Sequence, residues 1–84
     1  MNSRTSQSFR AAFQALPVDV RQRARRAYQL WRKDPMLPGL RFKRIGDDVS
    51  IRIGREYRAL GLLEGDTVTW YWIGKHDTYD RKLD

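Results

Sequence analysis

The sequence contains no cysteine and a single histidine, His76. Without cysteine there is no disulfide framework and no thiolate zinc site, and one histidine excludes a site of clustered imidazoles. We therefore expect no bound metal and no cofactor. No apolar run approaches the ~20 residues of a transmembrane helix, and the N-terminus lacks the apolar stretch of a secretory signal, which predicts a cytoplasmic protein.

What the chain has in excess is positive charge. Its 84 residues include 17 Lys and Arg against 10 Asp and Glu, for a formal net charge of +7. The length fits one domain spanning residues 1–84. The cations are mostly arginines, whose guanidinium groups bind phosphates, so the excess favours a polyanionic partner such as nucleic acid. The alternative is a basic surface that is merely solvated.

Two helices are predicted in the first part of the chain. Apolar residues recur at helical spacing over residues 9–16, and Ser6 or Ser8 can cap this helix. A second helix begins at Pro17 and ends by Asp34, because another proline follows. Arginines fill one side of it. Its apolar stripe consists of Val20, Ala24, Ala27, Tyr28 and Trp31.

After the second helix the apolar residues alternate with a period of two. This pattern predicts antiparallel strands near residues 40–45, 49–53, 56–62 and 67–73, and a further strand over residues 2–5 is weakly signalled. The expected fold is α+β, with both helices on one face of the sheet and the other face open. Trp70 and Trp72 have the spacing of one strand face, which favours packing in the core.

Strand alternation also predicts a polar cluster on the open face. If Ile51 and Ile53 face the helices, Arg52 points to the other side, and Arg58 on the next strand joins it. Gly74 ends the last strand and delivers the C-terminal residues nearby. The residues expected at this face are Lys43, Arg52, Arg58, Lys75, His76 and Tyr79.

These residue types suit RNA cleavage without a metal. That reaction needs a base for the 2′-hydroxyl, an acid for the leaving 5′-oxygen and cations that stabilise the phosphorane. His76 titrates near neutral pH and can serve as acid or base, while Tyr79 can stack on a base or move a proton. The alternatives stay open: the arginines can be solvated strand residues, and Tyr79 can pack the tail onto the sheet.

Several short segments, in this order and spacing, make the sequence resemble toxins of the RelE/ParE superfamily from type II toxin–antitoxin systems. The segments are Leu16-Pro17, Asp34-Pro35, Leu40–Lys43, Ile51–Gly54, Tyr57–Leu60 and Trp72–Asp80. The resemblance covers nearly the whole chain. It implies a RelE-like fold, with a short β-strand and two helices followed by a curved antiparallel β-sheet and a short C-terminal element.

The resemblance also implies an activity and a set of residues. Family members that cleave mRNA act in the ribosomal A site without a metal, and they pair with a partly disordered, acidic antitoxin protein. By position, the catalytic residues would be Arg52, Arg58, His76 and Tyr79, and the phosphate-binding residues Lys43, Arg41, Arg44 and Lys75. The general base is not identified; Glu56 is one candidate. The alternatives are a ParE-like DNA gyrase poison and a non-catalytic RNA-binding or partner-binding domain on the same scaffold.

Overall fold

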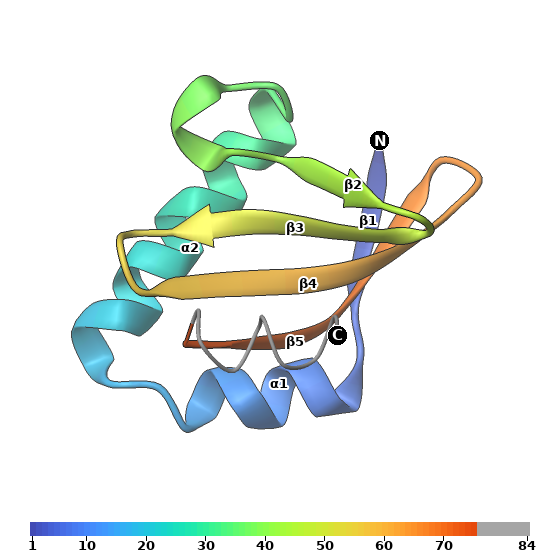
Figure 1. Cartoon of the computed structure of the whole chain (residues 1–84). Helices are drawn as coiled ribbons and strands as arrows, with labels where there is room; N and C mark the ends of the chain where they lie inside the picture. The colour runs from blue at the N-terminus through green and yellow to red at the C-terminus, as the bar shows by residue number, and fades with distance from the viewer. Residues whose placement is uncertain (76–84) are drawn as a thin grey trace.

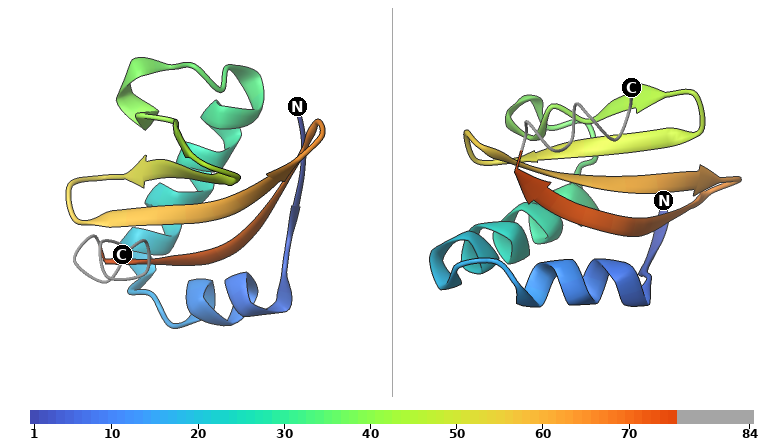
Figure 2. Two further views of the ribbon diagram at one scale, coloured as in Figure 1. Left: turned by 45° about the vertical axis from the view of Figure 1, so that its right-hand side comes forward. Right: turned by 60° about the horizontal axis from the view of Figure 1, so that its bottom comes forward.

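The computed structural model describes residues 1–75. In chain order the elements are β1 (Asn2–Thr5), α1 (Gln7–Gln14), α2 (Val18–Lys33), a 3-10 helix η1 (Pro38–Leu40), β2 (Lys43–Ile45), β3 (Asp48–Ile53), β4 (Tyr57–Glu64) and β5 (Thr67–Lys75). The strands form one sheet in the order β1-β5-β4-β3-β2 (Figure 1). The sheet is curved, and α1 and α2 lie on the same side of it (Figure 2), which confirms the predicted α+β architecture.

Local sequence signals place both helices. Ser6 caps α1, since its Oγ accepts a hydrogen bond of 3.1 Å from the backbone N–H of Phe9. Pro17 is the N-cap of α2 and Asp34 its C-cap, as the prolines predict. The side chains of α2 that face the sheet are the predicted apolar stripe, of which Trp31 is fully buried. The helices therefore cover one face of the sheet with apolar surface.

Aromatic rings form the centre of the core. Trp31 of α2 meets Trp70 of β5 edge to face, with ring centroids 5.3 Å apart, and the ring centroid of Phe42 lies 6.1 Å from that of Trp31. Edge-to-face pairs at this separation contribute about 0.5–1.5 kcal/mol beyond the area that they bury. Aliphatic strand residues pack around them: Val49, Ile51, Ile53, Ala59, Val68 and Ile73. No helix within residues 1–75 is long and apolar enough to cross a membrane.

The weakly signalled N-terminal strand is present and changes the topology. β1 runs parallel to β5, with Asn2 opposite Thr67 and Thr5 opposite Trp70. The other neighbouring strands are antiparallel, so the antiparallel meander carries one parallel strand at its edge. The backbone N–H of Ser6 also donates to the carbonyl of Trp70, which extends the contact between the N-terminal segment and β5 to the start of α1.

The first predicted strand of the meander is shorter than expected. Leu40 is buried, but it ends the 3-10 helix that Pro38 begins. Arg41 then adopts a left-handed conformation with φ 46°, and its N–H donates to the carbonyl of Pro38. This turn ends the 3-10 helix, and β2 begins only at Lys43.

A β-bulge in the middle of the sheet overturns one prediction. Leu60 is opposite Trp72 and Gly61 is opposite Trp70, so Tyr71 is an extra residue in β5. Trp70 is therefore buried in the core, whereas Trp72 lies on the opposite face; the two tryptophans do not share a face. Gly61 is required here, because a Cβ atom at this position would lie 2.6 Å from Cγ1 of Val68. A glycine inside a strand is a signal for such a bulge.

Candidate functional site

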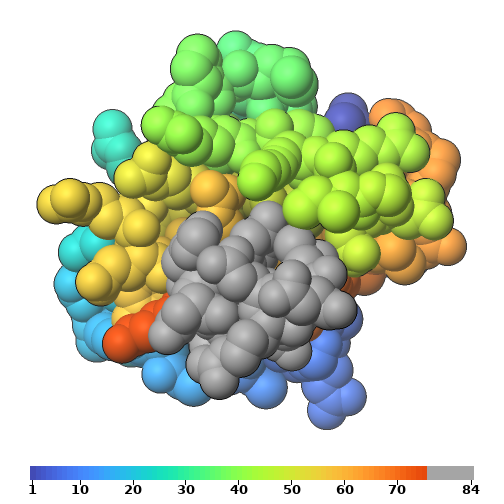
Figure 3. All heavy atoms as spheres, viewed as in Figure 1, coloured from blue at the N-terminus to red at the C-terminus, as the bar shows by residue number. Residues whose placement is uncertain are grey.

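The sheet surface opposite the helices, called the outer face below, carries the predicted cluster. Strand pairing places Arg52 of β3 beside Arg58 of β4, and Arg58 beside Gly74 of β5. A second row of paired residues runs Lys43, Ser50, Leu60 and Trp72. In Figure 3, which views this face, atoms of β2, β3 and the β3–β4 turn are visible in green to yellow. Residues from four strands thus meet on one surface.

Arg52 and Arg58 are the electrostatic centre of the outer face. They are direct cross-strand partners, and like charges in that position repel each other. The side chain of Arg52 is oriented by a hydrogen bond of 2.8 Å from Nε to the carbonyl oxygen of Gly54. Arg58 is only 9% exposed, so its charge is poorly screened by solvent. Two guanidinium groups held side by side favour an anion that bridges them, such as a phosphate.

No helix within residues 1–75 covers the outer face (Figure 2), as the sequence predicts, but the middle of this face is buried. Ser50 is 1% exposed and Leu60 is 0% exposed, although strand alternation directs both away from the helices. Tyr71 lies on the same face, and its phenol donates a hydrogen bond of 2.8 Å to Oδ1 of Asp48. Because β4 separates β5 from β3, the tyrosine side chain crosses β4 to make this contact. Sequence reasoning missed the pair because the two residues are on strands that are not neighbours in the sheet.

The indole of Trp72 also covers part of the outer face. A Cβ atom added at Gly74 would lie 2.4 Å from Cζ2 of Trp72, so the ring lies directly over the glycine. Gly74 is paired with Arg58, which brings the aromatic ring to the strand position next to the buried guanidinium. A half-buried indole beside arginine is the combination that binds bases and phosphates of single-stranded nucleic acid.

The structure brings together three of the predicted residues and separates others. Lys43, Arg52 and Arg58 share the outer face. Arg44 is opposite Val49 and so lies on the other side of β2 from Lys43, with its Nε bonded to the carbonyl of Gly46.

The remaining predicted residues lie away from the arginine pair or beyond the described chain. Lys75 is exposed and opposite Tyr57, on the helix side of the strand end, and Arg41 is exposed in the turn before β2. Glu56 is exposed in the β3–β4 turn, where it lines a hollow with Arg23 and Arg55. His76 and Tyr79 lie outside the described residues. Residues 1–75 contain no group of three or more His, Cys, Asp or Glu that could hold a metal ion.

Several solved structures with this fold are toxins or toxin–antitoxin complexes. The RelB-RelE antitoxin–toxin complex from Methanococcus jannaschii matches with a TM-score of 0.73 and 17% identity, covering 95% of this chain and 98% of that chain. The isolated RelE toxin of E. coli matches with a TM-score of 0.66 and 14% identity, covering 98% and 94%. A YoeB/ParE toxin from Agrobacterium tumefaciens matches with a TM-score of 0.70 and 13% identity, covering 90% and 99%. At these identities the likeness establishes the fold.

The family is established by the sequence. A search of the curated proteins found no significant match. The family model of the ParE-like toxin domain, however, matches residues 18–81, from the start of α2 to beyond the last strand. This segment includes the arginine pair, Lys43 and Trp72. The chain therefore belongs to the ParE-like toxin domain family, within the RelE/ParE superfamily of toxins from toxin–antitoxin systems.

Proposed function

We propose that this protein is an endoribonuclease toxin that cleaves mRNA on the ribosome and so inhibits translation. The observation that carries the proposal is the cross-strand pair of Arg52 and Arg58 on the outer face, with Lys43 on the same surface. Two adjacent guanidinium groups match the charge of a scissile phosphate, and their positive charge does not depend on pH in the physiological range. The mRNA would bind across the outer face in the cytoplasm.

The reaction proceeds by attack of the 2′-oxygen on the adjacent phosphorus. The bond from phosphorus to the 5′-oxygen breaks, a 2′,3′-cyclic phosphate forms, and the 5′-oxygen leaves with a proton. Arg52 and Arg58 stabilise the additional negative charge of the phosphorane, and Lys43 binds a neighbouring phosphate. Trp72 stacks on a base next to the cleaved bond. His76 and Tyr79 stay the predicted groups for proton transfer, and no metal takes part.

A cognate antitoxin is the protein partner in this proposal. The structures from Methanococcus jannaschii and Mycobacterium tuberculosis with the same fold are complexes of a toxin with its antitoxin. An acidic antitoxin would neutralise the net charge of +7 and cover the arginine pair. The complex would keep the toxin inactive until the antitoxin is removed.

The test is cleavage of a defined mRNA on purified ribosomes, with the 5′ ends mapped by primer extension. We expect cuts that require the ribosome and survive chelation of divalent cations after the complex has formed. Arg58→Lys keeps the charge but removes the planar fork, and we expect it to lower the rate by about 10²–10³-fold, the cost of losing one oriented donor to the transition state. Arg26→Gln on α2 removes a charge away from the outer face and serves as the control. Cleavage that is equal in both variants contradicts the proposal.

The second candidate function is poisoning of DNA gyrase, which the description of the matched family as ParE-like favours. A supercoiling assay with purified gyrase and relaxed plasmid separates the two. Trapped gyrase–DNA complexes together with intact mRNA would support this candidate. A domain that binds RNA or a partner without catalysis would give neither result.

A further inference from the structure

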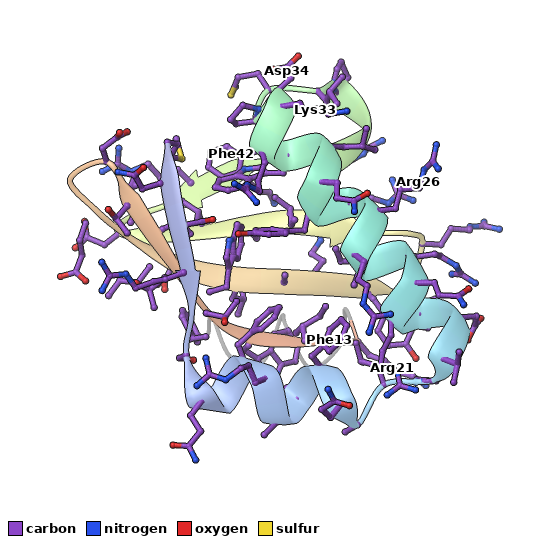
Figure 4. All side chains as sticks on the ribbon, turned by 180° about the vertical axis from the view of Figure 1, so that it is seen from behind. Phe13, Arg21, Arg26, Lys33, Asp34 and Phe42 are labelled. Atoms are coloured by element: carbon purple, nitrogen blue, oxygen red, sulfur yellow. The ribbon has the colours of Figure 1, made fainter. Side chains whose placement is uncertain are left out.

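A cavity between the helices and the sheet is not used by the proposed chemistry. It has a volume of about 110 Å³, and its lining comes from α1, α2 and the inner face of the sheet. We call it the inner cavity. The rings of Phe9, Phe13 and Tyr28 form its helix side. Figure 4, which views the helix side of the molecule, shows Phe13 between α1 and the first half of α2.

Small residues leave the inner cavity unfilled. Ala24 of α2 and Ala59 of β4 both line it, and both are buried. No residue of α1 is fully buried, so the rings of this helix lie over the cavity without filling it. Protein interiors contain few voids larger than a water molecule. The lining is almost entirely apolar, and an apolar cavity of this kind binds a small apolar molecule in preference to water.

Arg25 gives the inner cavity a charged entrance. Of the described residues that line the cavity, Arg25 alone is charged and alone is exposed, so the cavity opens to solvent beside it. Its guanidinium carbon lies 5.2 Å from the centroid of the Phe13 ring. Within residues 1–75 it has no hydrogen bond and no ion pair. A guanidinium over a ring keeps the N–H groups at its edge for a carboxylate.

We propose that the inner cavity binds a small aromatic carboxylate, with the ring of the ligand in the cavity and its carboxylate paired with Arg25. The volume suits a single ring, since an apolar cavity of about 150 Å³ binds benzene. Ile51 and Ile53 line the cavity and point to the opposite side of β3 from Arg52. The inner cavity is therefore separate from the outer face, and the proposal does not depend on the endoribonuclease function.

The first experiment locates the ligand by NMR of the whole protein with labelled isoleucine methyl groups. The probe is benzoate, whose ring current shifts the signals of nearby methyl groups. Ile51, Ile53 and Ile73 line the cavity and should shift together, with a dissociation constant of about 1 mM for a ligand of this size. Ile45 lies on the outer face, 43% exposed, and should not shift. Unchanged signals, or an equal shift of Ile45, overturn the proposal.

A pair of arginine variants tests the contact with the carboxylate. Arg25→Gln should weaken benzoate by about tenfold or more, as for loss of a hydrogen bond to a charged group. Arg26→Gln should not, because Arg26 does not line the cavity and projects away from α1 (Figure 4). Benzyl alcohol has the ring without the charge, so neither variant should change its affinity. Equal losses of benzoate in the two variants, or equal affinities of the unchanged protein for benzoate and benzyl alcohol, overturn the choice of a carboxylate.

A third variant fills the cavity. Ala24→Leu should weaken benzoate by at least tenfold and leave the Tm equal or higher, because the added carbons occupy empty space. Benzoate affinity that is retained in folded Ala24→Leu overturns the site. If Ala24→Leu does not fold, the comparison of Arg25→Gln with Arg26→Gln still decides, since both side chains are exposed. Arg52→Gln should bind benzoate as the unchanged protein does; a loss equal to that in Arg25→Gln would place benzoate at the arginine pair and overturn the proposal.

Discussion

The arginine pair on the outer face predicts that a simple phosphate ion stabilises the folded protein. Arg52 and Arg58 are direct cross-strand partners, and Arg58 is 9% exposed. A hydrogen bond to a charged group contributes about 1.5–3 kcal/mol, so two guanidinium groups at the lower end give about 3 kcal/mol. This corresponds to a phosphate dissociation constant of about 5 mM. Inorganic phosphate is therefore a direct probe of the site.

The expected shift in melting temperature follows from this affinity. With about 50 mM phosphate, a ligand that binds only the folded state adds about 1.4 kcal/mol. For a domain of this size, that raises the Tm by about 6–11 °C. Arg52→Gln removes one of the two groups, leaves about 1.5 kcal/mol of binding and reduces the stabilisation to about 0.3 kcal/mol. Its Tm should then rise by only about 1–2 °C.

The assay is differential scanning calorimetry in phosphate and in chloride at matched ionic strength. Phosphate also stabilises proteins without binding to a site, so only the difference between variants counts. Arg32→Gln is the control, since it removes a guanidinium that lies over the ring of Tyr28 on α2. In chloride, Arg52→Gln should unfold within about 1 kcal/mol of the unchanged protein, because relief of cross-strand repulsion offsets the lost bond to Gly54. Equal phosphate shifts in all three proteins would refute the assignment of an anion site.

Three further substitutions test the bulge, the outer face and the first helix by urea unfolding. Gly61→Ala should cost about 1–3 kcal/mol, because its Cβ would lie 2.6 Å from Cγ1 of Val68 in the packed core; an unchanged midpoint would contradict the bulge. Tyr71→Phe should cost about 0.5–1.5 kcal/mol by removing the hydrogen bond to Asp48; in a double-mutant cycle with Asp48→Asn, additive losses would show that the two do not interact. Ser6→Ala should cost about 1 kcal/mol through loss of the α1 cap, whereas an equal loss in Ser6→Asp, which keeps an oxygen that can cap the helix, would contradict the capping assignment.

The helices and the core were predictable because their signals are local. The apolar residues of α2, which include Trp31, recur every three to four positions. The prolines at its two ends set the limits of α2, because proline is not tolerated inside a helix, whatever surface the helix packs against. The inward direction of Ile51 and Ile53 follows from alternation alone. The same alternation correctly placed Arg52 and Arg58 on one face. Periodicity therefore accounts for the part of the candidate site that lies on regular strands.

The parts that were not predictable depend on contacts between distant segments. β1 has four polar or small residues with no periodicity, and it is a strand only because β5 offers a free edge beside it. β2 is short because the chain turns at Arg41. This turn was not predictable, because arginine rarely adopts a positive φ. Trp72 was assigned to the wrong face because a two-residue period fails at a bulge, for which Gly61 was the one available signal.

The bulge at Tyr71 contributes to both the stability and the candidate site of this protein. In a regular strand, Trp70, Trp72 and Gly74 would share the inner face, and Ile73 would point outward. The extra residue shifts the inward–outward alternation of β5 by one position. Ile73 therefore points inward and is buried in the core, with an exposed fraction of 3%. The same change puts Trp72 on the outer face, where it covers Gly74 beside Arg58 and joins Tyr71, which reaches Asp48. A single inserted residue thus completes the apolar core and brings the indole of Trp72 beside the arginine pair, so Gly61→Ala should impair folding and, if the proposed function holds, RNA binding together.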